Sequence, residues 1–245
     1  MSKPFYAIGD IHGQLPMLED ALARIERDGG WDAQVVFLGD YTDRGAFSRE
    51  VLDLLIEGQA QGRNWTCLRG NHDQMAAMFL EDYPRQDARL LPGYHWLHPR
   101  IGGLETLKSY GVEVHEGERI YQIHARLKAA VPQSHVDFLN GLRPYYQFGE
   151  LLFVHAGLVP DIRLDDQDPD DLIWIRNEFL HHTGPHPWLV VHGHTHVDTP
   201  EHRGNRVNLD TGAGYGHALT AAVFEGRDCW VLGAQGRERL LPGTV

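Results

Sequence analysis

The sequence predicts an α/β protein, and two observations support that prediction. Short apolar runs rich in Val, Ile, Leu and aromatic residues recur along the chain, and several end abruptly at a polar cluster, often with a glycine. Continuous runs of four to six such residues are typical of strands buried on both faces. Stretches with helical periodicity separate the first runs, and the order strand, helix, strand is that of a βαβ unit.

Taken in order, five predicted strands run into a polar cluster. They are FYAI before Gly9-Asp10, QVVFL before Gly39-Asp40, WTCL before Arg69-Gly70-Asn71, LLFV before His155, and WLVV before His192. Between the first two, PMLEDALARIER has Leu18, Leu22 and Ile25 on one helical face, and REVLDLLIEG repeats the pattern after the second strand. Ligands of such sheets bind beyond the carboxyl ends of the strands, so the five clusters are expected to form one site.

The rest of the chain divides into two regions. Residues 74–150 contain short amphipathic stretches among loops, which predict a helical insertion over the edge of the sheet or the mouth of the site. After it, RVNLD (206–210), LTAAVF (219–224) and CWVLG (229–233) are closely spaced, as in a meander of strands. Because no linker or internal repeat interrupts the chain, we expect a single domain over residues 1–245.

The acidic run DDQDPDD (165–171) has two interpretations. Clustered carboxylates suggest calcium, but Pro169 followed by Asp170 and Asp171 just before the apolar LIWI is typical of a helix start. The helix dipole favours acidic side chains at that end. We therefore predict a helix start here and no calcium site.

Composition limits the classes of partner. The formal net charge of −12 disfavours a general nucleic-acid or anionic-membrane surface. Two cysteines provide no disulfide framework, the first residues lack the apolar core of a signal peptide, and no apolar run reaches the roughly 20 residues that span a bilayer. These features predict a cytoplasmic protein with no membrane partner.

The residues at the strand ends indicate a metal site. Carboxylate, imidazole and amide oxygen together suit two divalent ions such as Mn²⁺, Fe²⁺ or Zn²⁺, and the absence of cysteine disfavours a closed structural zinc site. Two ions close together need a bridging carboxylate, and they can lower the pKa of a shared water from 15.7 toward about 7. Each cluster alone is also explained as an ordinary turn, but five in series are not.

The motifs GDIHG (9–13), GDYTDRG (39–45), RGNHD (69–73), VHAG (154–157) and GHT (193–195) resemble the signature blocks of the phosphoprotein phosphatases within the calcineurin-like metallophosphoesterases, in family order. The resemblance spans residues 5 to about 225 and is nearest to compact bacterial enzymes. It implies a four-layer α-β-β-α sandwich with mixed sheets and two divalent metals, manganese being favoured over iron or zinc.

The resemblance also implies roles for individual residues. Asp10 and His12 would hold the first metal and Asp40 would bridge both, while Asn71, His155 and His194 would hold the second. His72 would protonate the leaving oxygen, with Asp43 orienting it. Arg44, Arg176 and Arg69 would bind the phosphate, since a guanidinium fork suits a tetrahedral anion. Arg176 has an alternative, a surface ion pair with the nearby aspartates.

Three histidines stand at alternate positions of VVHGHTHV (190–197). Alternate residues of a strand share one face, so periodicity alone does not separate His192, His194 and His196. The resemblance selects His194 as a ligand and leaves His196 as a further candidate, because the broader family uses a G-H-x-H pattern. We expect His192 to pack at the end of the strand.

The predicted activity is hydrolysis of phosphomonoesters by a metal-bridged hydroxide, with a serine/threonine or dual-specificity protein phosphatase as the main hypothesis. Hydrolysis of diadenosine tetraphosphate or another dinucleoside polyphosphate is the alternative. We favour the first because the intact DRG motif contains Asp43, which the resemblance implies is usually lacking in bacterial dinucleoside enzymes. The complete ligand set argues against an inactive phosphate-binding scaffold, and the net charge against a nuclease. Tyr215, in GAGYGHAL (212–219), either contacts substrate or packs beneath the turn.

Overall fold

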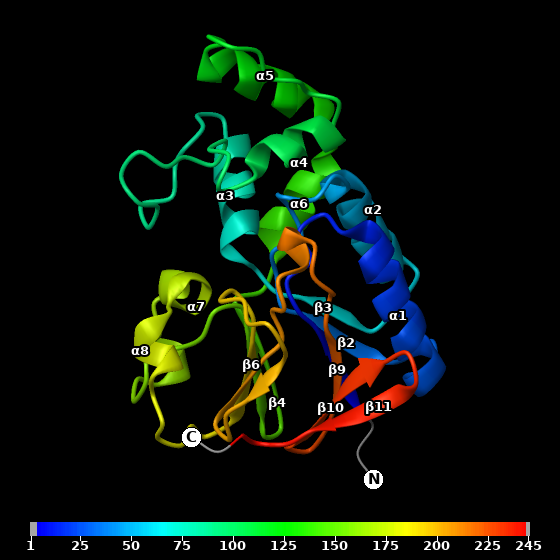
Figure 1. The fold of residues 1–245 in the computed structure, drawn as a ribbon. Helices are drawn as coiled ribbons and strands as arrows, with labels where there is room; N and C mark the ends of the chain where they lie inside the picture. Colours follow the sequence, from blue (N-terminus) through cyan, green and yellow to red (C-terminus); the bar gives the residue numbers. More distant parts are fainter. Residues whose placement is uncertain (1–3, 244–245) are drawn as a thin grey trace.

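The computed structural model describes residues 4–243, which form two β-sheets with helices on their outer faces (Figure 1). The first sheet has the strand order β11-β10-β9-β1-β2-β3 and the second has the order β4-β5-β6-β8-β7. The strands of the first sheet are β1 (Phe5–Ile8), β2 (Gln34–Phe37), β3 (Trp65–Cys67), β9 (Ala221–Glu225), β10 (Asp228–Gly233) and β11 (Gly236–Leu240). Those of the second are β4 (Tyr145–Phe148), β5 (Leu151–Val154), β6 (Leu189–His192), β7 (Glu201–His202) and β8 (Arg206–Asn208).

Helices cover both outer faces and one end of the sheets (Figure 1). The helices beside the first sheet are α1 (Leu15–Gly29) and α2 (Ser48–Ala60), and those beside the second are α7 (Pro169–Trp174) and α8 (Asn177–Leu180). Those above the sheets are α3 (Asn71–Leu80), α4 (Gly103–Ser109), α5 (Ile120–Ala130) and α6 (Gln133–Gly141). Short 3₁₀ turns occur at Leu164–Asp166 and Ala213–Tyr215.

The alternation of side chains along β1 produces the layers. Tyr6 and Ile8 belong to the core that also contains the apolar face of α1, whereas Phe5 and Ala7 belong to the core between the two sheets, with Phe153. A third apolar cluster joins the outer face of the second sheet to Phe179 of α8. Because a buried strand needs apolar cover on both sides, the two sheets and their helices form the predicted α-β-β-α sandwich.

Both sheets are mixed, as predicted. The prediction that RVNLD (206–210) forms a meander with the two strands that follow it is wrong. The β9, β10 and β11 strands do form an antiparallel meander. The RVN segment does not join it, since β8 pairs with β6 and β7 in the second sheet. Closeness in sequence was misleading here, because residues 209–220 cross from one sheet to the other. The stretch 74–150 contains α4 to α6 and also the edge strand β4.

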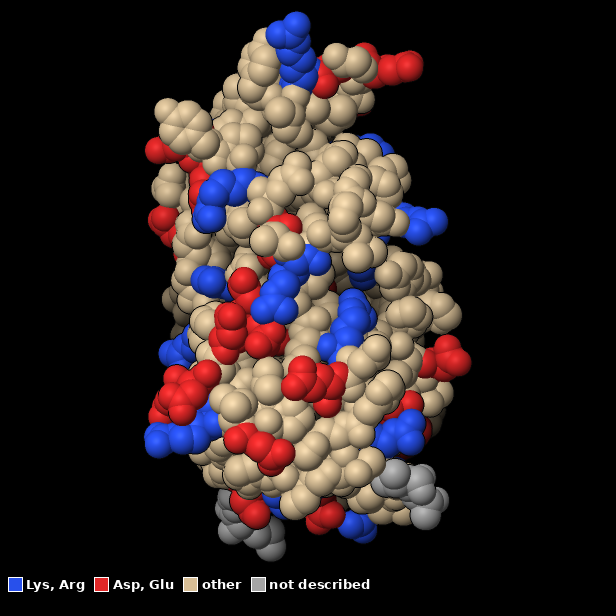
Figure 2. All heavy atoms as spheres, turned by 90° about the vertical axis from the view of Figure 1, so that its left-hand side faces the viewer, with Lys and Arg blue, Asp and Glu red and all other residues tan. Residues whose placement is uncertain are grey.

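Parallel pairing brings the polar clusters to one end of the sandwich. The strands β1, β2 and β3 are parallel, as are β5, β6 and β8, so their carboxyl ends lie on the side of the helical insertion (Figure 1). None of the helices within residues 4–243 has the length and apolar character required to cross a membrane. On the face that carries α7 and α8, acidic and basic side chains lie side by side without a continuous basic stripe (Figure 2).

The acidic run begins a helix, as predicted. Asp168 is the N-cap of α7 and its side chain accepts a hydrogen bond from the backbone N–H of Asp170, while Pro169 occupies the first turn. An oxygen at this position satisfies one of the donors that a helix start leaves unpaired. The carboxylates of this run are therefore explained by helix capping and by an ion pair between Asp171 and Arg89 at 2.8 Å.

Candidate metal centre

The loops that follow the strands have an unusual backbone. Among the described residues, six that are not glycine have positive φ, and five of them lie in these loops: His12, Asp40, Asp43, Arg44 and His194. Left-handed conformations cost energy for residues with a Cβ atom, and they concentrate where function requires a fixed geometry. The strained residues therefore lie in three of the five motifs, GDIHG, GDYTDRG and GHT.

Asp40 lies between two groups of buried side chains. One group contains His12 and His72, the other contains His155 and His194, and in each the potential ligand atoms lie within 4.8 Å of one another and of an Asp40 oxygen. Its Oδ2 is 3.4 Å from His12 Nε2 and its Oδ1 is 3.5 Å from His155 Nε2. A carboxylate that faces two imidazole clusters through different oxygens is placed to bridge two cations.

The hydrogen bonds of His155 show that a cation suits this site. Its Nδ1 is 2.8 Å from the backbone oxygen of Leu38, so Nδ1 carries the proton. Burial lowers the pKa of His155, so the ring is neutral at pH 7 and Nε2 presents a lone pair. His155 Nε2 lies 3.1 Å from Asn71 Oδ1, which is also an acceptor. Two acceptors this close repel each other unless a cation lies beside them.

His12 and His194 complete this pattern. His12 Nδ1 is 2.9 Å from the backbone oxygen of Thr42, and burial lowers the pKa of this ring, so His12 Nε2 also presents a lone pair. His194 Nδ1 is 2.9 Å from Asn71 Oδ1, while its Nε2 is buried without a hydrogen-bond partner in the described chain. Imidazole, carboxylate and amide oxygen are the donors that manganese, iron and zinc accept.

Asp10 lies against the loop that contains His194. It is buried and accepts hydrogen bonds from the backbone N–H of His194, the shorter at 3.0 Å. Burial and the nearby carboxylates of Asp210 and Asp40 raise the pKa of Asp10 well above its usual range. Close approach of these loops requires glycine, since a Cβ at Gly70 would lie 2.1 Å from Asp40 Oδ1 and one at Gly193 2.0 Å from Asp10 Oδ1.

Two buried carboxylates near the centre were missed from sequence. Asp73 accepts from the backbone N–H groups of Asp40, Tyr41 and Gly70, and so ties the second and third loops together. Asp210 follows β8. Burial raises the pKa of Asp210 and repulsion from Asp40 adds to the rise, while repulsion from Asp210 helps to raise the pKa of Asp10. The rule that located Asp10 after β1 also applies to Asp210, because β8 is parallel to β6 and ends on the same side.

His72 is held by a fully buried carboxylate. Its Nδ1 is 2.7 Å from Asp43 Oδ2, and the side chains of Trp96 and Thr106 donate to the same carboxylate at 2.9 and 2.7 Å. Because Nδ1 donates to Asp43, Nε2 points toward the centre, where it can exchange a proton or bind a metal. Trp96 and Thr106 come from the helical insertion, which therefore contributes to the site.

The three arginines occupy different surroundings. Arg44 reaches into the centre, with Nη1 2.6 Å from His12 Nε2 and Nη2 3.0 Å from His72 Nε2, and its guanidinium lies 4.6 Å above the Tyr215 ring. Arg176 donates to Thr195 Oγ1 at 2.9 Å. Burial lowers the pKa of Arg176, against an opposing attraction from Asp40 and other carboxylates of the centre. Arg69 donates to the backbone oxygen of Asn140 on α6.

The acidic run is paired by other arginines, with Arg89 2.8 Å from Asp171 and Arg163 3.7 Å from Asp165, whereas Arg176 donates to Thr195, next to His194. The three histidines of residues 192–196 also separate. His192 is buried against Phe179 with its Nε2 3.2 Å from Arg206, so it packs as expected. His196 is exposed, belongs to neither close group of ligands, and contacts the Tyr215 ring at 5.2 Å between centroids.

The family model described as calcineurin-like phosphoesterase matches residues 3–222. The chain belongs to this family. As a calcineurin-like phosphoesterase it is a metal-dependent hydrolase, and the two groups around Asp40 are candidates for holding its metal ions.

Relatives of this phosphoesterase fall into two groups. A protein of Halalkalibacterium halodurans named bis(5'-nucleosyl)-tetraphosphatase PrpE [asymmetrical] is 29% identical over 245 residues, covering 90% of this chain and 89% of its own. A serine/threonine-protein phosphatase of Caenorhabditis elegans is 31% identical over 153 residues, covering 61% of this chain and 32% of its own. The first group matches along its whole length and the second only in part.

Solved structures support the fold. A candidate diadenosine tetraphosphatase superposes with a TM-score of 0.63 and 22% identity, over 99% of this chain and 96% of the other. A mutant of a cold-active protein tyrosine phosphatase superposes with a TM-score of 0.61 and 18% identity, over 98% and 81%. At these identities the structural similarity establishes the α/β sandwich fold and gives no information about the substrate.

We expect divalent metal to stabilise the protein. Adding Mn²⁺ at 100 times its dissociation constant should stabilise the folded state by about 2.7 kcal/mol for one site, because the ion binds ligands that only the folded chain brings together. For a chain of this size that corresponds to a rise in Tm of roughly 5–10 °C. Calorimetry of chelator-treated protein with and without Mn²⁺ measures the shift. Equal midpoints would contradict a metal site, and Ca²⁺ provides a control for ionic strength.

Proposed function

We propose that this phosphoesterase hydrolyses dinucleoside polyphosphates, cutting the phosphate chain off-centre. The observation that carries the proposal is the extent of the similarity. The relatives named asymmetrical bis(5'-nucleosyl)-tetraphosphatases match 89–90% of this chain and 87–89% of their own, whereas the nematode protein phosphatase matches 61% and 32%. Residues outside the shared motifs form the surroundings that select a substrate, so agreement over the whole length favours the nucleotide substrate.

This ranking reverses the main hypothesis from sequence, which relied on Asp43. In this proposal the Asp43–His72 pair would act on the oxygen that leaves phosphorus rather than on the group beyond that oxygen. A proton donor helps an alcohol leaving group more than a nucleotide, so the pair by itself favours an alcohol, whereas the extent of the similarity favours a nucleotide. Hydrolysis of phosphoserine, phosphothreonine or phosphotyrosine is the second candidate. The buried Asp43–His72 pair would help most where the leaving group needs a proton.

In this proposal the ligands are those around Asp40. Asp10, His12 and Asp40 would hold one ion, and Asp40, Asn71, His155 and His194 the other. The metals would supply a water that deprotonates near neutral pH and positive charge beside the phosphoryl group. We leave His196 out of the ligand set because its ring lies against Tyr215.

The remaining residues bind the phosphate and deliver a proton. Arg44 would turn its guanidinium from the two histidines to the phosphate oxygens, supported by the Tyr215 ring beneath it. Arg176 would bind from the opposite side, beside Thr195. His72, held by Asp43, would protonate the leaving oxygen at Nε2. Arg69 makes its contact with α6 and would act only after rearrangement.

A parallel assay tests the proposal. We expect the manganese-loaded protein to convert diadenosine tetraphosphate to AMP and ATP with a kcat/KM at least ten times that for phosphoserine or phosphotyrosine peptides, measured by chromatography of the products. The reverse ratio would restore the protein phosphatase hypothesis, and two ADP molecules as products would contradict the off-centre cut. p-Nitrophenyl phosphate serves as the control for an active metal centre.

A further inference from the structure

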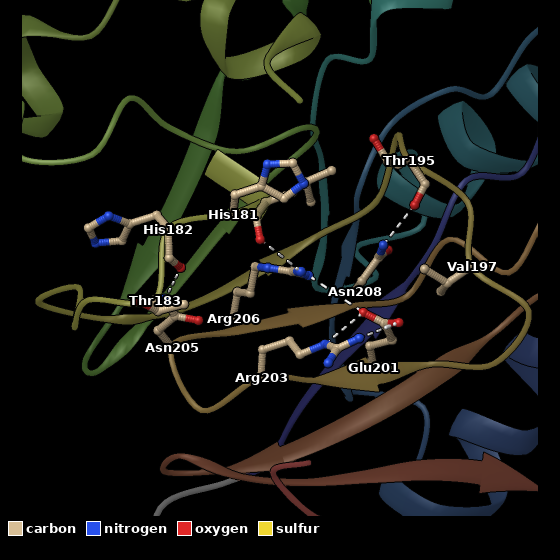
Figure 3. Close-up of a pocket in the computed structure, with 11 residues that line it drawn as sticks. His181, His182, Thr183, Thr195, Val197, Glu201, Arg203, Asn205, Arg206 and Asn208 are labelled. Atoms are coloured by element: carbon tan, nitrogen blue, oxygen red, sulfur yellow. Dashed lines mark hydrogen bonds and ion pairs between the residues drawn. The ribbon is translucent and has the colours of Figure 1, made fainter. Parts of the chain in front are cut away.

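A hollow of about 460 Å³ lies beside the metal centre, between the segment that follows α8 and the strands β7 and β8 (Figure 3). We call it the β7–β8 pocket and define it by Thr183, Thr195, Val197, Arg203, Asn205 and Arg206. In Figure 3, His181 and Thr195 lie on one side of it and the Arg203–Glu201 pair on the other. None of the proposed ligands or phosphate-binding arginines lines it.

Thr195 connects the pocket to the metal centre. It follows the proposed ligand His194, and its hydroxyl accepts a hydrogen bond from Arg176, one of the arginines proposed to bind the phosphate. Its backbone oxygen accepts from Asn208 Nδ2 at 2.7 Å, and both residues line the pocket (Figure 3). A ligand whose phosphate lies beside Arg176 would therefore have this hollow next to it for the rest of the molecule.

The charges in the pocket are already matched by protein groups. Arg203 forms a bidentate pair with Glu201 at 3.0 and 2.9 Å. Arg206 is buried and donates to the backbone oxygen of Leu180 and contacts His192. Since both guanidinium groups have partners, the pocket lacks the free cationic fork that binds a phosphate. Its lining combines polar and apolar groups without a free guanidinium, which suits a neutral heterocycle with a sugar.

The side chain of Asn205 is fixed by two backbone acceptors. Asn205 is buried, and its side-chain NH₂ donates to the backbone oxygens of His182 and Gly184, both at 2.9 Å, which leaves its carbonyl oxygen as an acceptor. The volume lies within the range of small-molecule sites, about 300–1,000 Å³, and is more than a single phosphate needs.

We infer that the β7–β8 pocket binds the base and ribose of a nucleotide whose phosphate lies at the metal centre. The inference rests on the proposed function in one respect, since it takes the substrate to carry a nucleoside. It adds a binding site to that function and identifies the residues that would separate nucleotides from other phosphoesters.

Product inhibition tests the pocket without requiring a dinucleoside substrate. AMP and ribose 5-phosphate are compared as inhibitors of p-nitrophenyl phosphate hydrolysis by the manganese-loaded protein. We expect AMP to bind at least ten times more tightly, because only AMP carries a base. Thr183→Trp, at an exposed residue of the rim, should fill the pocket and abolish that difference while kcat/KM for p-nitrophenyl phosphate stays within two-fold. Thr199→Trp, at an exposed threonine outside the pocket, is the matched control and should retain it.

The outcomes separate the pocket from the proposed function. Equal inhibition by AMP and ribose 5-phosphate in the unmodified protein would overturn the pocket, as would a ten-fold preference that survives in both Thr183→Trp and Val197→Trp, which fill it from different segments. AMP preference without hydrolysis of diadenosine tetraphosphate would retain the pocket and remove the proposed function. Titration of adenosine alone, followed by amide NMR, should shift Thr183, Thr195 and Asn208. Shifts confined to other regions would contradict the site.

Discussion

Asp40→Asn should lower kcat/KM on the order of 10³-fold for every phosphoester tested, a loss of several kcal/mol of transition-state stabilisation. Among residues 4–243, Asp40 is the one carboxylate that belongs to both groups of histidines, at 3.4 Å from His12 and 3.5 Å from His155. The amide keeps the shape but removes the negative charge that offsets the repulsion of two cations. Turnover of p-nitrophenyl phosphate and metal content per chain are the measurements, and we expect fewer than two bound ions.

Asp20→Asn is the matched control. Asp20 lies on α1 with an exposed fraction of 66% and pairs with Arg24, so the same chemical change should leave both activity and metal content unchanged. Near-normal turnover by Asp40→Asn with two ions bound would remove the bridging role from the mechanism. Loss of activity with full metal content would instead assign Asp40 to positioning the loop that contains Arg44.

His72→Asn should have an effect that depends on the leaving group. If His72 donates the proton, turnover falls about 10²–10⁴-fold for phosphoserine, whose alkoxide leaves badly. It should fall less than ten-fold for p-nitrophenyl phosphate and for dinucleoside polyphosphates, whose leaving groups need little protonation. Steady-state rates over a series of aryl and alkyl phosphates give the dependence as a slope against the pKa of the leaving group.

Metal content separates the two roles open to His72. Its ring nitrogen lies within 4.8 Å of ligand atoms of His12 and Asp40, so the geometry also accommodates a ligand. The variant should retain two ions per chain if His72 is a proton donor and lose one if it is a ligand. His115→Asn, at an exposed histidine of the helical insertion, is the control. Equal losses for good and poor leaving groups, with metal intact, would exclude proton donation.

The residues that contact the centre are mostly those expected from sequence, for a local reason. A strand that ends beside a ligand needs both a sharp turn and a polar side chain, and adjacent residues in the sequence supply both. Asp10, Asp40, Asn71 and His155 are recognisable in this way, and the buried positions of all four agree with it. The same rule, applied to RVNLD, would have found Asp210, but only once β8 is known to be parallel to β6.

The sequence by itself determined the α/β class and the five strand ends that carry the polar clusters, because these follow from apolar periodicity and from short motifs, and the family resemblance selected His194 among the three alternate histidines. Tertiary structure alone decided which sheet receives β8, that His196 lies against Tyr215, and that Trp96 and Thr106 hold Asp43. It also formed the β7–β8 pocket. These outcomes depend on contacts between segments far apart in the chain, and local pattern carries no information about them.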